Sequence, residues 1–165
     1  QATEEFYPDI VETGLVCEKQ IQENVVIDMD PPLMLRAVNN LMSNAIKYGK
    51  QGKKIEVQME KIKEKAVVRI INYGHIIPKD ALPHVFEQFY RVEESRSFNT
   101  GGSGLGLAIA KSIVELHHGE ITATSDAQGT IFSFTIPIVK ENENEENEFK
   151  SKQNENIDSR DGMVS

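Results

Sequence analysis

The sequence predicts an α+β fold, a two-layer sandwich in which helices cover one face of a mixed, mostly antiparallel sheet. Two stretches with helical spacing of apolar residues, near residues 32–48 and 105–118, supply the helical layer. Two pairs of apolar segments joined by turn residues, near 55–71 and 121–138, supply the sheet. No internal repeat is visible, so the pattern indicates one globular unit.

The first predicted elements are a strand and a long helix. A strand is expected over residues 24–28, where Val-Val-Ile forms an apolar run. Asp30 can act as a side-chain N-cap, and two prolines follow it in the first helical turn. A helix is therefore expected over residues 32–48, ended by Gly49 and Gly52. Its buried face is expected at Leu35, Val38, Met42 and Ala45.

Two hairpins supply most of the sheet. Residues 55–59 alternate between apolar and polar side chains, and the charged turn 61–65 separates them from the apolar run 66–71. These segments predict a central antiparallel pair. Residues 121–125 and 130–138 bracket the turn sequence Asp-Ala-Gln-Gly and predict a second hairpin.

A second helix is expected between the hairpins, over residues 105–118. Ile109, Ile113 and Leu116 recur at helical spacing and should face inward. Gly119 follows the last helical residue and is expected to be the C-cap.

Length and composition indicate one domain. The chain has 165 residues, 39% of them hydrophobic, which is enough for one core and too short for two ordinary domains. From residue 141 apolar side chains almost disappear, so we expect residues 1–140 to form the domain and 141–165 a disordered tail. The formal net charge of −8 argues against a nucleic-acid partner or an anionic-membrane surface.

The ends and the single cysteine add three expectations. Cys17 is the sole cysteine, which excludes an internal disulfide and predicts a core thiol. No apolar run approaches the length needed to cross a bilayer. The chain starts at Gln1 without a signal-peptide pattern, so we expect a soluble piece of a longer chain.

The strongest local signal is the run Gly-Gly-Ser-Gly-Leu-Gly-Leu at residues 101–107, which leads into the second helix. Glycine backbone can approach an anion closely, and a helix N-terminus presents N–H groups with partial positive charge. The run therefore predicts a phosphate site. It lacks the Lys-Ser/Thr of a Walker loop and the strand that precedes a dinucleotide fingerprint. A flexible glycine hinge is the alternative.

A second group of polar residues lies on the first long helix. Asn40, Asn44 and Lys47 share one helical face, with Tyr48 beside them. Asparagine oxygens suit Mg²⁺, which is usually completed by phosphate and water. A solvated polar face with a tyrosine at its edge is the alternative.

Four segments resemble motifs of one family. Residues 40–48, Asn-Leu-Met-Ser-Asn-Ala-Ile-Lys-Tyr, resemble the N box of sensor histidine kinases. Residues 85–91, Val-Phe-Glu-Gln-Phe-Tyr-Arg, resemble their F box, and residues 102–107 resemble their G2 box. His-Gly-Glu-Ile at 118–121, followed by Gly-Thr at 129–130, is similar to their closing glycine motif.

The motifs occur in family order, over roughly residues 25–139, so the chain is identified as a member of the sensor histidine kinase catalytic domains. The resemblance implies the ATP-binding fold of the GHKL superfamily, which includes gyrase, a heat-shock chaperone and mismatch-repair ATPases.

The resemblance also implies roles for single residues. Asn44 would hold Mg²⁺ between the phosphates, with Asn40 in support. Lys47 would neutralise phosphate charge, and Tyr48 would pack on adenine. Arg91 would reach the terminal phosphate, where charge must be offset during transfer. Asn44, Lys47 and Arg91 are thus the expected catalytic residues, with Asn44 the metal ligand.

Other residues of the expected ATP site come from the remaining boxes, and Arg96 would be a second contact to the terminal phosphate. The expected ATP-binding set is Asn40, Asn44, Lys47, Tyr48, Asn72, Gly74, Ile77, Arg91, Gly102, Ser103, Gly104, Leu105, Gly106, Leu107 and Thr130.

One box departs from the family pattern. Where many members read Asp-x-Gly-x-Gly-Ile, residues 72–77 read Asn-Tyr-Gly-His-Ile-Ile, without the acid or the second glycine. The family's acid accepts a hydrogen bond from the adenine amino group. Asn72 can still accept through its amide oxygen and can donate to a ring nitrogen. We expect weaker nucleotide binding, because a charged hydrogen bond is worth roughly 1.5–3 kcal/mol.

The region between the F and G2 boxes, residues 87–104, is rich in charge, Ser and Gly. This composition predicts a mobile lid over the nucleotide, with a long surface loop as the alternative. Phe86, Phe89 and Tyr90 are apolar for a loop, and some of them should plug the core or contact the partner helix of the intact kinase.

None of the four histidines, at positions 75, 84, 117 and 118, lies in the His-Glu-x-x-x-Pro context of a phosphoacceptor. His117 and His118 close a helix, where a cation would complement the dipole. The acceptor histidine is therefore expected upstream of this chain.

The implied function is transfer of the γ-phosphate of ATP, with Mg²⁺, to a histidine on an upstream dimerisation domain, for relay to a response regulator. This piece is expected to be monomeric. The intact kinase is expected to be a membrane-anchored homodimer with this domain in the cytoplasm.

Three other functions are the alternatives. Hydrolytic GHKL ATPases place a glutamate base where this chain has Asn40, which cannot accept a proton from water. Serine kinases of the anti-sigma type usually lack the Phe-Tyr-Arg box. A pseudokinase that docks on a partner without catalysis is the third.

Overall fold

The computed structural model describes residues 2–91 and 104–138. Its five-stranded sheet has the order β1-β2-β3-β5-β4. The strands are β1 (Val16–Ile21), β2 (Lys54–Ile62), β3 (Lys65–Asn72), β4 (Glu120–Asp126) and β5 (Gly129–Pro137). β1 runs parallel to β2, and all other neighbours are antiparallel. The predicted mixed, mostly antiparallel sheet is confirmed, as are both hairpins.

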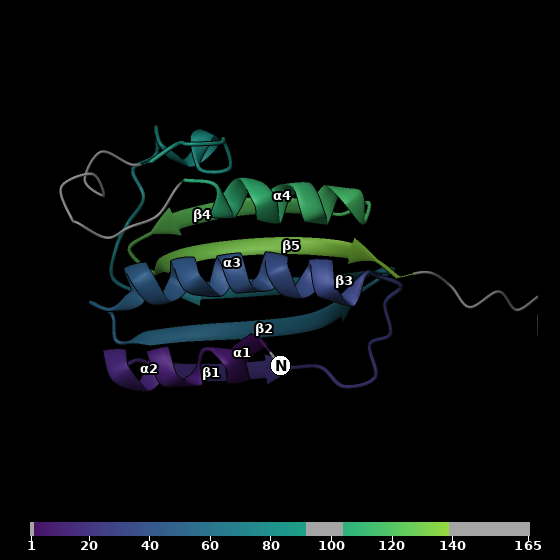
Figure 1. The fold of residues 1–165 in the computed structure, drawn as a ribbon, viewed down its shortest axis with the longest axis horizontal. Coiled ribbons are helices and arrows are strands. Elements are labelled where there is room, and N and C mark those ends of the chain that lie inside the picture. The colour runs from purple at the N-terminus through teal and green to yellow at the C-terminus, as the bar shows by residue number, and fades with distance from the viewer. Residues whose placement is uncertain (1, 92–103, 139–165) are drawn as a thin grey trace, which may run out of the picture.

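The long helices α3 (Pro31–Gly49) and α4 (Gly106–Leu116) lie side by side on one face of the sheet (Figure 1). The short helices α1 (Ala2–Glu5) and α2 (Tyr7–Thr13) contact α3, and a 3₁₀ turn, η1 (Leu82–His84), precedes α4. The core lies between the helices and the sheet. Its fully buried side chains include Leu41, Met42, Ala45, Ile55, Ile70, Val114 and Phe132.

Helix α3 begins as the sequence predicts. The Asp30 carboxylate accepts a hydrogen bond from the Leu33 N–H at 2.9 Å, and prolines occupy the first turn. Met42 and Ala45 are buried as expected, but Leu35 is only half-buried. The buried face is centred instead on Met34, Ala37, Leu41, Met42, Ala45 and Ile46.

The predicted strand at residues 24–28 is wrong. These residues form no strand, and the strand of this region is β1, at Val16–Ile21. β1 pairs with β2 alone and its side chains are mostly exposed, so its sequence shows little apolar alternation. Ile27 packs against the core from irregular backbone. Cys17, in β1, also packs against the core as expected, and burial raises the pKa of its thiol.

The end of α4 differs from the prediction in two ways. Leu116 is 65% exposed rather than inward-facing. The residue with left-handed backbone is His118, with φ of 58°, and not Gly119. Gly119 is needed for a different reason: a Cβ atom there would lie 2.0 Å from the carbonyl oxygen of Thr135. The close approach of the chain to β5 therefore requires glycine at position 119.

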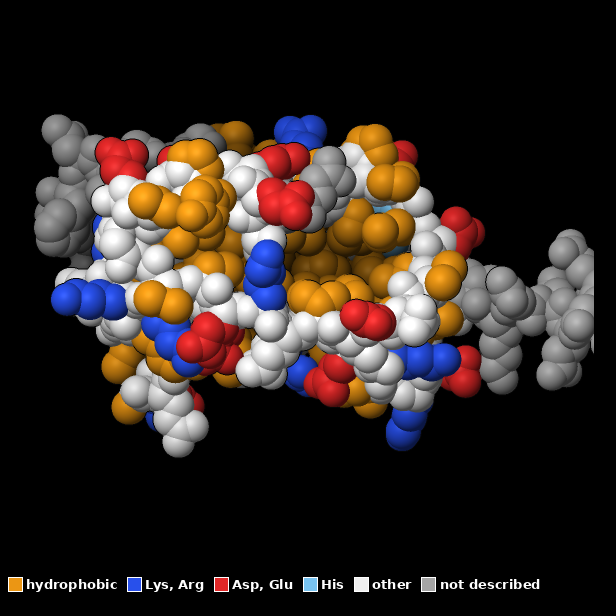
Figure 2. Space-filling model, turned by 90° about the horizontal axis from the view of Figure 1, so that it is seen from below, with side chains coloured by type: hydrophobic (Ala, Val, Ile, Leu, Met, Phe, Trp, Pro, Cys, Tyr) orange, Lys and Arg blue, Asp and Glu red, His pale blue; other side chains and the backbone are white. Residues whose placement is uncertain are grey.

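The surface on the β1 side is hollowed near its middle, and hydrophobic side chains line the hollow (Figure 2). α2 and β1 expose Tyr7, Val11, Val16 and Ile21. Over residues 2–91 and 104–138, no helix combines the length and the apolar composition that a bilayer crossing requires. The predicted tail at 141–165 and most of the predicted lid lie outside the described residues.

Candidate functional site

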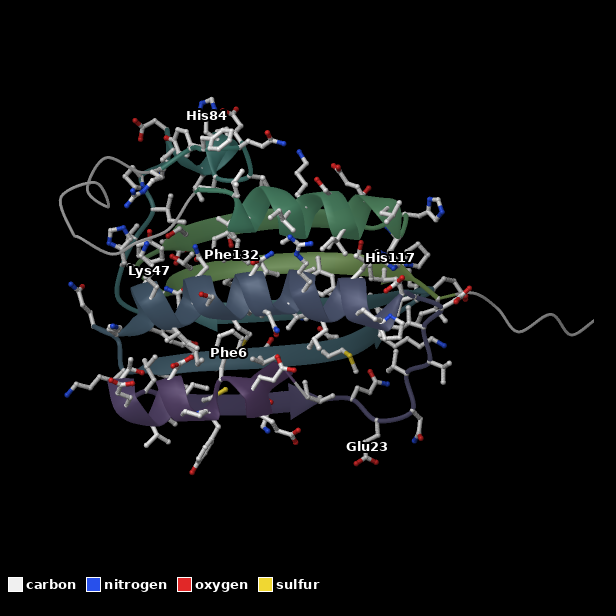
Figure 3. The ribbon with its side chains drawn as sticks, viewed as in Figure 1. Phe6, Glu23, Lys47, His84, His117 and Phe132 are labelled. Atoms are coloured by element: carbon white, nitrogen blue, oxygen red, sulfur yellow. The ribbon has the colours of Figure 1, made fainter. Side chains whose placement is uncertain are left out.

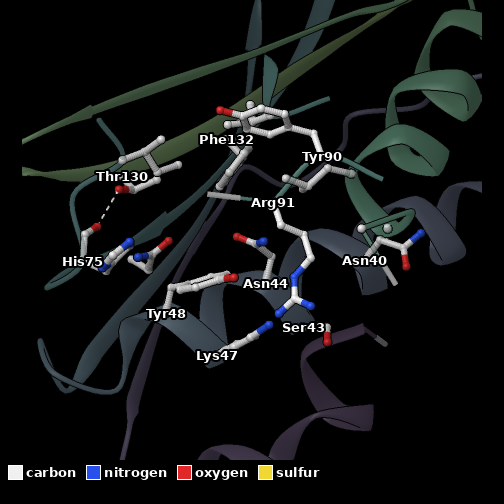
Figure 4. Close-up of a pocket in the computed structure, with 16 residues that line it drawn as sticks. Asn40, Ser43, Asn44, Lys47, Tyr48, His75, Tyr90, Arg91, Thr130 and Phe132 are labelled. Atoms are coloured by element: carbon white, nitrogen blue, oxygen red, sulfur yellow. Dashed lines mark hydrogen bonds between the residues drawn. The ribbon is translucent and has the colours of Figure 1, made fainter. Parts of the chain in front are cut away.

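A cavity of about 330 Å³ lies between α3, the start of α4 and the ends of β3 and β5 (Figure 4). Its volume is within the range of small-molecule sites. Residues 40, 43, 44, 47 and 48 of α3 line one wall, because residues three or four apart share a helical face. The same helix packs the side chains of Leu41 and Ala45 into the core.

Most of the residues that the sequence predicts for the ATP site line this cavity. They are Asn40, Asn44, Lys47, Tyr48, Asn72, Ile77, Arg91, Gly104, Gly106, Leu107 and Thr130. Gly74 and Leu105 do not line it. Gly102, Ser103 and Arg96 lie outside the described residues.

Five further residues line the cavity and were missed from the sequence. They are Ser43, His75, Val85, Tyr90 and Phe132. Ser43 could have been found from helical spacing, because it lies one turn from Asn40. Phe132 could have been found from strand alternation, because it shares a face of β5 with Thr130. For His75 the sequence carried no signal.

Asn72 is the most unusual group in the cavity. It ends β3, its side chain is 1% exposed, and both its amide oxygen and its amide nitrogen lack a hydrogen-bond partner among the described residues. A buried polar group left unpaired costs about 1–3 kcal/mol. The cavity therefore contains a buried donor and acceptor that a bound molecule could satisfy.

Three hydroxyl-mediated hydrogen bonds fix the loop that follows Asn72. The Thr130 hydroxyl donates to the His75 carbonyl oxygen at 3.0 Å, since a carbonyl can only accept. The Ser125 hydroxyl, 2.6 Å away, must then donate to Thr130, and it accepts from the Ile77 N–H at 2.8 Å. These bonds tie the loop to the β4–β5 hairpin and commit the only hydroxyl hydrogen of Thr130.

Aromatic rings and a cation lie beside this loop. The rings of Tyr48 and His75 stack, with centroids 5.5 Å apart and an interplanar angle of 29°. Lys47 Nζ lies 5.0 Å from the centre of the Tyr48 ring. Figure 4 shows Tyr48, His75 and Thr130 toward one side of the cavity, and Arg91, Ser43 and Asn40 toward the other. One side is suited to a flat ring and the other to an anion.

The start of α4 forms part of the cavity wall through Gly104, Gly106 and Leu107. The N-cap residue is Leu105, whose side chain cannot accept a hydrogen bond from the first-turn N–H groups. The amide nitrogen of Asn40 is buried beside this turn without a partner among the described residues, and its oxygen lies near Gly106. The first-turn N–H groups of α4 and the amide nitrogen of Asn40 are hydrogen-bond donors, and they favour an anion at this end of the cavity.

A charged network on the opposite face of the sheet holds the end of β3. The Tyr73 hydroxyl donates to Glu56 Oε1 at 2.7 Å, and Lys54 Nζ lies 2.8 Å from the same oxygen. Lys54, and then Tyr73, hold the pKa of Glu56 below its usual range. The Glu56 carboxylate in turn raises the pKa of Tyr73. This network anchors the residue next to Asn72.

The aromatic residues of the F box have separate positions. Phe86 packs edge-on against Phe132, with ring centroids 6.0 Å apart, so it plugs the core as predicted. Phe89 is 70% exposed, with a positive φ of 63°, and its N–H donates to the Gly104 carbonyl oxygen. Tyr90 lines the cavity.

Comparison with known proteins identifies the family. Residues 29–140 match the family described as histidine kinase-, DNA gyrase B-, and HSP90-like ATPase. The sensor protein VanS of Enterococcus faecium is 37% identical over 139 residues, which cover 84% of this chain and 36% of VanS. The sensor histidine kinase CusS of Escherichia coli strain K12 is 38% identical over 133 residues, which cover 81% of this chain and 28% of CusS. This chain therefore spans well under half the length of either relative.

The fold agrees with these sequence relationships. The catalytic domain of the histidine kinase ThkA superposes with a TM-score of 0.72 at 25% identity, covering 82% of this chain and 87% of that domain. The resemblance found in the sequence is thus confirmed. The chain belongs to the histidine kinase-, DNA gyrase B-, and HSP90-like ATPase family.

Proposed function

We propose that this chain binds ATP in the cavity and is the catalytic domain of a sensor histidine kinase. The observation that carries the proposal is the buried, unpartnered amide of Asn72. Adenine presents an amino group that donates and a ring nitrogen that accepts on the same edge. One asparagine amide can pair with both, which would remove the cost of leaving the two amide atoms unpaired.

The arrangement of the other groups supports one orientation of the nucleotide. Tyr48 and His75 lie toward the side where the base would stack, and Arg91 lies toward the other side (Figure 4). With the base at Asn72, the phosphates would extend toward Lys47, Arg91 and the start of α4. Cationic side chains and a helix N-terminus are the groups that stabilise charge on a transferred phosphoryl group.

A single Mg²⁺ ligand from the protein fits this site. The amide of Asn44 lines the cavity between the positions of Asn40 and Lys47 on α3. Mg²⁺ usually takes one or two protein ligands and completes its shell with phosphate and water. When bound, the ion would neutralise phosphate charge. Asn44 would then position the metal, and Lys47 would contact the phosphates directly.

The residues that line the cavity favour phosphate transfer over ATP hydrolysis. Asn40 lies one turn before Asn44 and lines the cavity, and its amide cannot act as the general base that would activate water. The acceptor would be a histidine on a dimerisation domain upstream of Gln1, and a response regulator would receive the phosphate next. The intact protein would be a membrane-anchored homodimer with this domain on the cytoplasmic side, because VanS and CusS are sensor proteins.

The experiment is phosphate labelling of the longer natural protein that contains this chain, with radiolabelled ATP and Mg²⁺. We expect a protein-bound label that acid removes and alkali preserves, as for phosphohistidine, and no label in Asn44→Ala. An acid-stable label would indicate a serine kinase. Released inorganic phosphate without a protein label would indicate a hydrolytic ATPase. ATP binding without either product would indicate a docking module, and each of these three results contradicts the proposal.

A further inference from the structure

We infer that the cavity also accepts 6-oxopurine nucleoside triphosphates, of which inosine triphosphate is the simplest. The inference rests on the proposed nucleotide site and adds the class of base that the site admits. It follows from Asn72, whose amide carries one donor group and one acceptor group into the cavity, both buried and both without a partner among the described residues.

Adenine and hypoxanthine present opposite patterns to this amide. The adenine edge has a donating amino group at carbon 6 and an accepting ring nitrogen beside it. Hypoxanthine has an accepting oxygen at carbon 6 and a donating N–H beside it. The asparagine amide pairs with adenine when its oxygen faces the amino group and its nitrogen faces the ring nitrogen. It pairs with hypoxanthine after the amide rotates by half a turn, which exchanges the positions of its oxygen and nitrogen. Both pairings make two hydrogen bonds.

Nothing among the described neighbours fixes the amide in one orientation. A hydrogen bond to either amide atom would do so, and neither atom has one. Gly49, whose backbone packs close to the Asn72 side chain, has no side chain to offer. The Thr130 hydroxyl donates its hydrogen to the His75 carbonyl oxygen, so it cannot hold the Asn72 oxygen. The bound base would therefore set the orientation of the amide.

An alanine at this position tests the pairing with both bases. Its side chain has neither a donor nor an acceptor, so any hydrogen bond between a base and Asn72 is lost. If Asn72 pairs with both bases, the variant Asn72→Ala should weaken the binding of both purine nucleotides by similar factors. If the amide pairs with adenine alone, only the binding of ATP should weaken.

The test is calorimetric titration of this chain with ATP and with inosine triphosphate, both with Mg²⁺, and with cytidine triphosphate as the pyrimidine control. We expect the dissociation constants for the two purine nucleotides to agree within about tenfold. In Asn72→Ala we expect both dissociation constants to rise by at least about tenfold, and their ratio to stay within about threefold of the ratio for the unsubstituted chain. Because the ratio is measured within one protein, a partial loss of folded protein does not change it.

The control variant is Gln128→Ala, which removes an amide from the exposed β4–β5 turn and should leave both dissociation constants unchanged. Binding of ATP with inosine triphosphate more than about tenfold weaker would overturn the inference and leave the proposed ATP site intact. A loss of affinity in Asn72→Ala for ATP but not for inosine triphosphate, or cytidine triphosphate binding as tightly as ATP, would also overturn it. Failure of all three nucleotides to bind would instead overturn the proposed function.

Discussion

His117 accepts a hydrogen bond from the backbone N–H of Asp30, with Nε2 and the nitrogen 3.0 Å apart. Its other ring nitrogen, Nδ1, lies 2.7 Å from the Ile113 carbonyl oxygen and must donate to it. In this geometry Nδ1 carries the donating hydrogen and Nε2 is the acceptor. His117 thus joins the last turn of α4 to the start of α3, at the opposite end of α3 from Lys47 (Figure 3).

His117→Ala should destabilise the fold by about 1–2 kcal/mol, because it removes one hydrogen bond between α4 and the start of α3 and one within the last turn of α4. Urea unfolding followed by circular dichroism measures this change. His118→Gly is the matched control. His118 is exposed and has a φ of 58°, so glycine there should keep or raise stability, by up to about 1 kcal/mol. Equal unfolding midpoints for His117→Ala and the unsubstituted chain would contradict the role of the ring.

Glu56→Gln should lower stability by about 1 kcal/mol at pH 7, since it removes a carboxylate bonded by Lys54 and Tyr73. The pKa of Glu56 is lowered in the folded state, so its contribution is present above the unfolded-state pKa of about 4.3. That contribution is lost as the pH falls through the lower folded-state pKa. The difference in the free energy of unfolding between Glu56→Gln and the unsubstituted chain should therefore narrow below about pH 4.

Urea titrations at several pH values measure this narrowing. Glu18→Gln is the control, because Glu18 pairs with Lys54 at 3.0 Å but is half exposed. It should cost less than about 0.5 kcal/mol at any pH. A constant difference between Glu56→Gln and the unsubstituted chain from pH 3 to pH 7 would show that the charge of Glu56 is not what stabilises the fold.

Gly119→Ala should cost at least about 2 kcal/mol, because its Cβ would collide with the Thr135 carbonyl oxygen and the Val114 side chain. Gly14→Ala is the control. Gly14 has a φ of 67° but no other atom within 4 Å of an added Cβ, so only backbone strain of about 1 kcal/mol is expected. Thermal unfolding of both variants shows which of them loses more stability. A smaller loss in Gly119→Ala than in Gly14→Ala would contradict the close approach to β5.

Asn44→Ala should abolish Mg²⁺-dependent nucleotide binding and leave the unfolding temperature nearly unchanged. The amide lines the cavity rather than the core, so the fold loses little when it is removed. Calorimetry with and without Mg²⁺, alongside a thermal melt of the same sample, separates the two effects. Unchanged affinity in the variant would remove Asn44 from the proposed metal site.

The parts of the fold that the sequence predicted are those with strong local signals. The Asp30 N-cap and the charged turn at 61–65 fixed the start of α3 and the β2–β3 hairpin. β1 was missed because an edge strand with exposed side chains has no alternation, and its pairing with β2 is set by tertiary contacts. Leu116 was assigned to the core because helical spacing alone cannot show where the covering sheet ends.

The cavity residues were likewise predicted only where local spacing along the chain places them together. Motif residues that share a helical face, such as Asn44 and Lys47, were found together because their spacing places them together. His75 was missed because its ring reaches Tyr48 only through the path of the loop, which depends on the hydroxyl bonds to Thr130 and Ser125. The lack of partners around Asn72 likewise depends on packing that spacing does not report.

Calorimetric titration of this chain with a non-hydrolysable ATP analogue, with and without Mg²⁺, tests the proposed nucleotide site directly. The proposed site predicts saturable binding that strengthens when Mg²⁺ is present and weakens in Asn72→Ala, where the base loses both hydrogen bonds. No binding up to millimolar nucleotide, in a sample whose thermal melt shows a folded domain, would contradict it.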